Sequence, residues 1–92
     1  MRDLIWSLPA RNDLQRIVTH YSEFDHDLGL TVIDTLQSRA EALLESPFIG
    51  APLEQTPLRK LSVPRLGFVI IYRVADQLVE IARIHHMREN WQ

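Results

Sequence analysis

The chain has 92 residues, of which 46% are hydrophobic and 24% are charged, and its formal net charge is −2. This length supplies one hydrophobic core, so we expect a single domain over residues 1–92. The absence of cysteine excludes disulfides and thiolate metal sites, and the slight negative charge disfavours a general nucleic-acid binder. The longest internal apolar run, residues 68–72, is far below the roughly 20 residues of a membrane span. With no apolar leader over residues 1–6, we expect a cytoplasmic protein.

The charge is distributed unevenly along the chain. Residues 1–56 carry four basic and nine acidic side chains, whereas residues 57–92 carry six basic and three acidic ones. Such an asymmetry is compatible with an anionic target for the second half, or simply with a mixed solvated surface.

The chain begins with a predicted strand and a predicted amphipathic helix. The strand covers Arg2 to Trp6, and Pro9 follows at a place that suits the first turn of a helix. Apolar residues then recur at helical spacing, which extends the first helix to about Glu23.

A second amphipathic helix follows after a short polar turn. Asp25 or Asp27 is suited to cap its N-terminus, and the apolar stripe runs to about Ser46. Pro47 ends it there, because the residue before a proline disfavours the helical conformation. The short connection predicts that the two helices form an antiparallel hairpin.

After a proline-rich loop, residues 47–57, the periodicity changes to that of strands. We expect strands at Leu58–Val63, Phe68–Val74 and Leu78–His85, joined by tight turns and therefore antiparallel. The order β-α-α-β-β-β predicts an α+β fold: a mostly antiparallel sheet with a helical hairpin packed on one face. Because both faces of Phe68–Val74 are apolar, we expect a central strand covered on one side by the helices and on the other by a partner chain.

Several segments, taken together in this order, resemble the RelE/ParE superfamily of bacterial toxins. They are "WSLPARNDLQRIVTHY", "ALLESPFIGAP", "LRKL", "FVIIYRV" and "EIARIHHMRENW". The first segment carries the residues that match the opening strand and first helix of the family, namely Trp6, Ala10, Asp13, Leu14, Ile17 and Tyr21. The ending, a strand followed by His, a variable pair, Arg and Trp, is most similar to the ParE branch.

The resemblance implies the toxin component of a type II toxin–antitoxin system, such as those that stabilise plasmids. Its partner would be a cognate antitoxin, encoded adjacently and of the ribbon-helix-helix type, that binds the toxin in a hetero-oligomer and prevents growth inhibition. ParE-like toxins imply DNA gyrase as the target, whereas RelE-like relatives imply a ribosome-dependent mRNA endonuclease. A relative that retains only antitoxin binding is the third alternative. No cofactor is implied.

The second half of the chain supplies the candidate contact residues for target or antitoxin. These are Arg59, Lys60, Arg73, Arg83, His85, Arg88 and Trp91. If the protein is a nuclease, the candidate machinery is Arg59, Arg73, Arg83 and His85, since arginine suits a phosphate and histidine can transfer protons. Met87 stands where RelE-like relatives often carry a tyrosine, so we assign no catalytic residue firmly and favour the gyrase interpretation.

Other interpretations of these residues are purely structural. Arg73 and Arg83 lie in apolar strands, so each is expected either to pair with a carboxylate (Asp76, Glu80 or Asp13) or to face the open side of the sheet. The structural alternative for His85 is a strand-end imidazole whose ring nitrogen bonds a backbone carbonyl, and we expect His86 to be exposed. A metal site is not expected, because consecutive strand residues point to opposite faces.

Overall fold

The computed structural model describes residues 2–88, which form one five-stranded sheet and a helical hairpin. The elements in chain order are β1 (Asp3–Trp6), α1 (Leu8–Phe24), α2 (His26–Glu41), the 3-10 turn η1 (Ala42–Leu44), β2 (Ala51–Pro52), β3 (Leu58–Val63), β4 (Phe68–Ala75) and β5 (Leu78–His86). The order across the sheet is β1-β5-β4-β3-β2. All pairs are antiparallel except β1 with β5, which is parallel.

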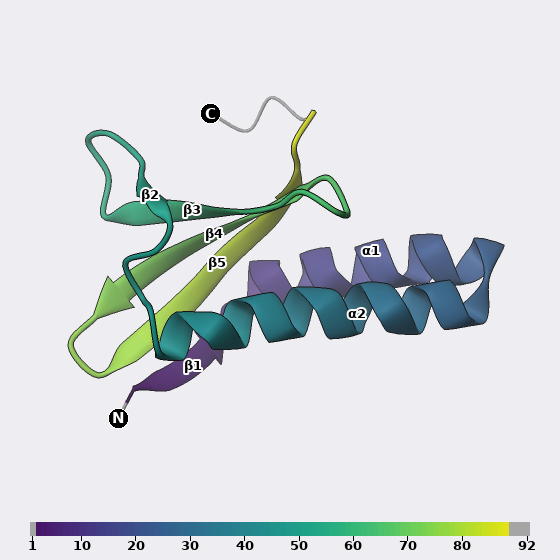
Figure 1. The fold of residues 1–92 in the computed structure, drawn as a ribbon, viewed down its shortest axis with the longest axis horizontal. Helices are drawn as coiled ribbons and strands as arrows, with labels where there is room; N and C mark the ends of the chain where they lie inside the picture. Colours follow the sequence, from purple (N-terminus) through teal and green to yellow (C-terminus); the bar gives the residue numbers. More distant parts are fainter. Residues whose placement is uncertain (1, 89–92) are drawn as a thin grey trace.

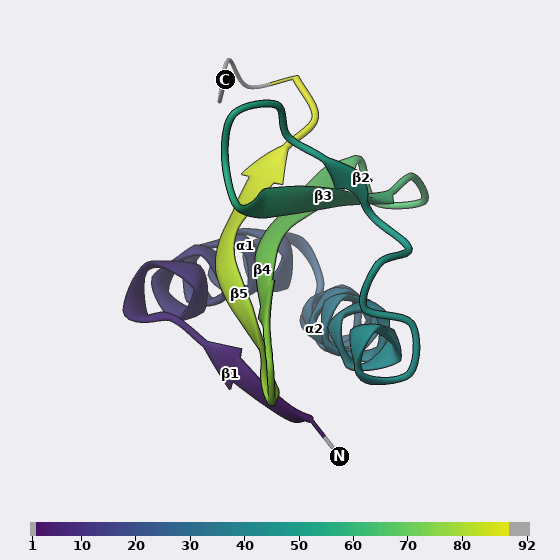
Figure 2. The same ribbon diagram turned by 90° about the vertical axis from the view of Figure 1, so that its left-hand side faces the viewer.

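The two helices lie side by side and cover one face of a strongly twisted sheet (Figures 1 and 2). The predicted α+β fold is therefore confirmed, and the three long strands match their predicted ranges within one residue at each end. Among residues 2–88, neither helix combines the length and the apolar composition needed to cross a bilayer.

Ser7 joins the first strand to the first helix. Its Oγ accepts a hydrogen bond from the Ala10 N–H (3.1 Å), which caps α1, and donates one to the Ala82 carbonyl (2.9 Å). Its backbone N–H donates to the Ile81 carbonyl (2.9 Å). One serine therefore ends the pairing of β1 with β5 and starts a helix above the same strand.

The second helix begins as predicted and ends earlier. Asp25, one of the two predicted caps, accepts hydrogen bonds from the N–H groups of Asp27 (2.8 Å) and Leu28 (3.4 Å). The α-helix stops at Glu41 rather than near Ser46, because the chain tightens into the η1 turn that buries Leu43 completely.

Gly29 sets the close approach of the two helices. A Cβ atom at this position would lie 3.1 Å from Ser22 Cβ and 3.2 Å from Ser22 Cα, and would overlap Ser22 Oγ. We predict that Gly29→Ala lowers the free energy of unfolding by about 1 kcal/mol, because the packing clash outweighs the gain in helix propensity. Urea unfolding of Gly29→Ala in the native and Ser22→Ala backgrounds checks this, since removal of the Oγ should reduce the loss. An equal loss in both backgrounds would contradict the assigned contact.

The strand β4 is buried on both of its faces, as predicted. Phe68, Ile70 and Tyr72 point into the core beneath the helices, whereas Val69 and Ile71 are buried on the opposite face. Part of the cover over Ile71 comes from this chain itself, because the loop after β2 curls over that face. The short β2 strand inside this loop was not predicted from the sequence.

Candidate functional site

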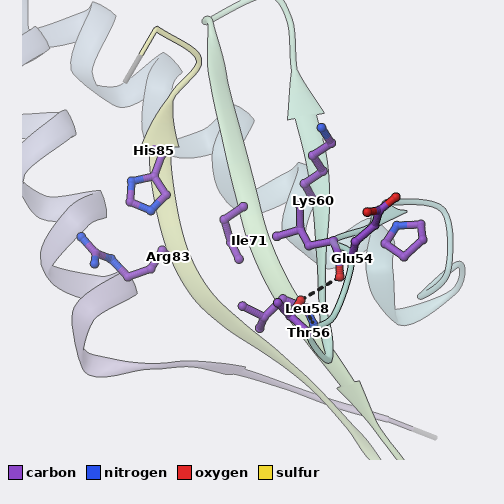
Figure 3. A pocket seen from close by; sticks show the side chains of 9 residues that line it. Glu54, Thr56, Leu58, Lys60, Ile71, Arg83 and His85 are labelled. Carbon is purple, nitrogen blue, oxygen red and sulfur yellow. Dashed lines mark hydrogen bonds between the residues drawn. The ribbon is translucent and has the colours of Figure 1, made fainter. Parts of the chain in front are cut away.

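The face of the sheet that the helices leave open contains a hollow of about 690 Å³ (Figure 3). The strands β3, β4 and β5 form its floor, and the loop between β2 and β3 forms one wall. It is lined by Pro52, Leu53, Glu54, Thr56, Leu58, Lys60, Ile71, Arg83 and His85. Its floor is mostly apolar, and its charged side chains are mostly basic.

Strand register places three of the predicted contact residues around this hollow. Lys60 of β3 and Arg83 of β5 both stand opposite Ile71 of β4, and His85 follows Arg83 on the same face. An irregularity in the pairing between Ile71 and Tyr72 leaves Ala82 as an extra residue, which brings Arg83 onto the open face. Lys60, Arg83 and His85 thus line one hollow, although Lys60 is distant from the other two in sequence.

Arg83 is held in position by the carboxylate of Asp13 in α1. The Nε atom donates to Oδ2 (2.8 Å) and Nη2 donates to Oδ1 (3.1 Å), a bidentate geometry. Asp13 is only 1% exposed and also accepts the backbone N–H of Ile84 (2.9 Å) and Nη2 of Arg16 (3.1 Å). The prediction that Arg83 pairs with a carboxylate is confirmed, and Asp13 is that partner.

The hydrogen bonds around Asp13 also determine its protonation. Burial by itself raises the pKa of this carboxyl, but Arg83, the Ile84 N–H and Arg16 together hold the pKa below its usual 3.8. Asp13 therefore stays ionised at neutral pH and keeps the guanidinium of Arg83 at the edge of the hollow.

Arg59 lies on the other face of β3 and does not line the hollow. Its Nη1 donates to the Gly50 carbonyl (2.7 Å) and the Phe48 carbonyl (3.4 Å), and its guanidinium lies 4.9 Å from the centre of the Phe48 ring. The structure thus assigns Arg59 a local role: it fixes the loop that precedes β2.

Tyr72 fixes the same loop from inside the core. Its fully buried hydroxyl donates to the Pro47 carbonyl (2.7 Å) and accepts from the Gly50 N–H (2.9 Å). Burial raises the pKa of Tyr72 above 10.0, against the opposing effects of the Gly50 N–H and Arg59. The hydroxyl is therefore protonated and remains a donor.

The remaining candidate residues are dispersed. Arg73 of β4 pairs with Glu80 of β5, with 3.3 Å between Nε and Oε1. Glu80 was one of the carboxylates predicted as its partner. Arg88 follows the end of β5 and its backbone N–H donates to Nδ1 of His86 (3.1 Å). Trp91 lies outside the described residues.

The two adjacent histidines point to opposite faces of the sheet, as their strand position predicted. His85 lines the hollow, whereas His86 packs edge-on against Phe68 on the helical side, with ring centres 5.3 Å apart. The expectation that His86 is exposed was wrong, because this aromatic contact half-buries the ring. Within residues 2–88 no group of three His, Cys, Asp or Glu side chains is arranged to hold a metal ion.

Sequence reasoning missed the apolar floor of the hollow and its wall. Leu58 and Ile71 were assigned to strands, and Glu54 and Thr56 to a loop, but none was named as a site residue. The available signal was the apolar character of both faces of Phe68–Val74, which indicated a second covered surface but not its composition.

The fold, a helical hairpin on a twisted sheet in which the first strand pairs with the last, matches solved structures of RelE/ParE toxins. In agreement, the chain superimposes on a toxin–antitoxin structure described as the chromosomal ParDE system of P. aeruginosa, with a TM-score of 0.84 and 25% identity over 96% of this chain and 98% of that one. A chain of the intact E. coli RelBE toxin–antitoxin complex gives a TM-score of 0.73 at 19% identity, over 97% of this chain and 100% of that one.

The sequence comparisons identify the family. The family model described as the ParE toxin of the type II toxin–antitoxin system parDE matches residues 4–91. The protein Toxin RelE2 of Caulobacter vibrioides is 35% identical over 86 residues, which cover 94% of this chain and 96% of the relative. The chain therefore belongs to the ParE toxin family within the RelE/ParE superfamily and is a type II toxin.

Proposed function

We propose that this toxin inhibits growth by binding a protein target in the cytoplasm, DNA gyrase, and that it does not cleave mRNA. One observation carries the proposal: the three arginines that a nuclease would need as phosphate ligands are engaged by this chain. Arg59 binds loop carbonyls on the other face of β3, Arg73 binds Glu80, and Arg83 is bound bidentately by Asp13.

A phosphate would have to compete for Arg83 with an ionised carboxylate that is already buried and in place. Displacing Arg83 would leave the carboxylate of Asp13, which is only 1% exposed, without one of its compensating charges, so displacement is unfavourable. His85 lies in the hollow beside Arg83 and Lys60, and the basic groups there can instead form hydrogen bonds at a protein interface. The apolar floor supplies the desolvated centre that such interfaces have.

We also propose that a cognate antitoxin covers the same hollow. The relatives of known structure include the ParDE and RelBE systems, and an antitoxin tail with apolar and acidic side chains would match the floor and the basic rim. A toxin whose hollow is filled by the antitoxin tail could not bind its target there. The outer groove of the helical hairpin, about 240 Å³ and lined by Leu14, Val18 and Ile33 among others, is the alternative antitoxin surface.

Gyrase inhibition is tested directly with purified toxin in supercoiling and DNA-cleavage assays. We expect loss of supercoiling and accumulation of cleaved DNA, both reversed by the product of the adjacent gene. Unchanged gyrase activity together with newly cut transcripts in arrested cells would establish the mRNA endonuclease instead. Normal growth during expression without a partner would indicate a relative that retains only antitoxin binding.

The basic rim of the hollow gives a further prediction. The double substitution Lys60→Glu and His85→Glu should weaken gyrase inhibition roughly tenfold or more, because it places two acidic groups where an interface requires basic ones. The matched control is Arg65→Glu, an exposed residue of the β3–β4 turn that does not line the hollow. Titration of both variants in the supercoiling assay measures the effect, and equal potency would exclude this surface.

A further inference from the structure

A second cleft lies on the opposite side of the sheet, between α1 and the adjoining ends of β4 and β5. Its volume is about 360 Å³, and it is lined by Arg16, His20, Tyr21, Phe68, Ile84 and His86, with Ile17 below them. It shares no residue with the hollow on the open face. Ligand pockets begin at roughly 300 Å³, so a few side chains of a partner would fill this cleft.

A continuous chain of aromatic and imidazole rings runs from the cleft, which His20, Tyr21, Phe68 and His86 line, to Phe24 beside it. Ring centres are 5.3 Å apart for Phe24 and His20, 5.4 Å for His20 and Tyr21, 6.3 Å for Tyr21 and Phe68, and 5.3 Å for Phe68 and His86. Every contact is edge-to-face. Such contacts fix the rings relative to one another, so the border is preorganised before a partner arrives.

Phe24 ends this chain of rings in solvent. Its side chain is 76% exposed, the largest value among the exposed large hydrophobic residues of the described chain. Large exposed aromatic side chains at the edge of a cleft with polar and apolar lining are typical anchors of protein interfaces. Because the neighbouring rings meet edge-to-face, their faces are partly covered, which disfavours successive stacking of nucleobases.

The electrostatics of the cleft select an acidic partner. Its lining includes Arg16, His20 and His86 but no Asp or Glu side chain. The side chain of Arg16 is 65% exposed and lines the cleft. His86 also lines the cleft and accepts the Arg88 N–H at Nδ1.

We propose that this cleft is a docking site for an acidic amphipathic segment of a partner protein. An apolar side chain of the segment packs on Phe68 and Ile84 between the rings, while its carboxylates lie next to Arg16 and the imidazoles. The site is separate from the hollow assigned to gyrase and antitoxin. The toxin can therefore hold this segment and its target at the same time.

The test is a titration of isotope-labelled toxin with a short peptide in which phenylalanine and leucine alternate with glutamate. We expect amide shifts at Tyr21, Phe68 and Ile84 and none on the open face of β3. Substitution His20→Glu should weaken binding about tenfold by charge repulsion, and Phe24→Ala about fivefold by loss of the anchor. Both side chains are exposed, so the fold should persist, as a circular dichroism spectrum verifies.

The control variant is Leu30→Ala, which truncates an exposed apolar residue of α2 that does not line the cleft and should bind as the native chain does. A peptide with lysine in place of glutamate should not bind. Equal affinity for the two peptides, shifts confined to the open face, or displacement of the acidic peptide by oligouridylate would each overturn the proposal. Gyrase inhibition by His20→Glu should remain unchanged, which separates this site from the proposed function.

Discussion

Replacement of Asp13 by alanine is expected to lower the free energy of unfolding by about 2 to 4 kcal/mol, because a buried carboxylate and its hydrogen bonds are lost while the half-exposed side chain of Arg83 is rehydrated. Three groups lose their acceptor: the guanidinium of Arg83, the backbone N–H of Ile84 and Arg16. The Ile84 N–H is buried, and leaving it unsatisfied costs roughly 1 to 3 kcal/mol by itself.

Urea unfolding followed by circular dichroism measures this loss. The matched control is Asp34→Ala, an exposed carboxylate of α2, which should change stability by less than about 0.5 kcal/mol. Asp13→Asn is a sharper variant, because the amide retains an acceptor oxygen for Ile84 but loses the charge that binds Arg83. A loss similar to that of the control would show that Asp13 does not hold α1 against β5.

The lowered pKa of Asp13 makes the stability of the fold depend on pH. Its pKa in the folded chain is lower than in the unfolded chain, so the folded state favours the ionised form. This contribution is complete above the unfolded pKa, near 3.8, and is lost as pH falls through the lower folded value. Acid unfolding of Asp13→Asn should lack that component, which a comparison of the two chains between neutral pH and pH values below 3.8 detects.

Removal of the hydroxyl oxygen of Tyr72 is expected to cause the second largest loss in the free energy of unfolding. Tyr72→Phe leaves the Pro47 carbonyl without its donor and the Gly50 N–H without its acceptor, both in a buried site. We expect a loss of about 2 to 3 kcal/mol in the free energy of unfolding. The loop that precedes β2 should also exchange its amide protons faster, because the hydroxyl bridges two points of that loop.

Tyr21→Phe is the matched control, since it removes a hydroxyl from a half-buried ring outside this site. Gly50→Ala provides an independent check of the geometry: its Cβ would lie 2.5 Å from the Tyr72 hydroxyl oxygen and 2.7 Å from the Lys60 carbonyl oxygen. Hydrogen exchange at Gly50 reports on both variants. Unchanged protection in Tyr72→Phe would show that the hydroxyl does not fix the loop.

The fold was predictable from local patterns, because each element carries its own signal. Asp25 caps α2, Pro9 lies in the first turn of α1, and the strand β3 begins and ends at the predicted residues. The end of α2 was misjudged because the choice between α and 3-10 winding depends on burying Leu43 beneath the hairpin. The strand β2 was missed because two residues are too few for a periodic signal.

The candidate site was predictable only in part, because it depends on register and on which face each side chain takes. Lys60, Arg83 and His85 were named from the sequence, and all three line the hollow. Arg59 was named too, but its side chain points to the other face of β3. The extra residue Ala82 decides where Arg83 lies, and no local pattern signals such an irregularity. Arg83 is therefore placed by tertiary structure and not by the alternation of its strand.

The position of β5 has a consequence for synthesis of the chain. The last strand lies inside the sheet, between the first strand and β4, and it also provides the Ile84 N–H that Asp13 of α1 accepts. The strand β1 thus has no strand to pair with, and Asp13 has no Ile84 N–H to accept, until β5 has left the ribosome. A toxin built in this way acquires its native surface only after β5 has been synthesised, and a chain that ends before β5 cannot acquire it at all.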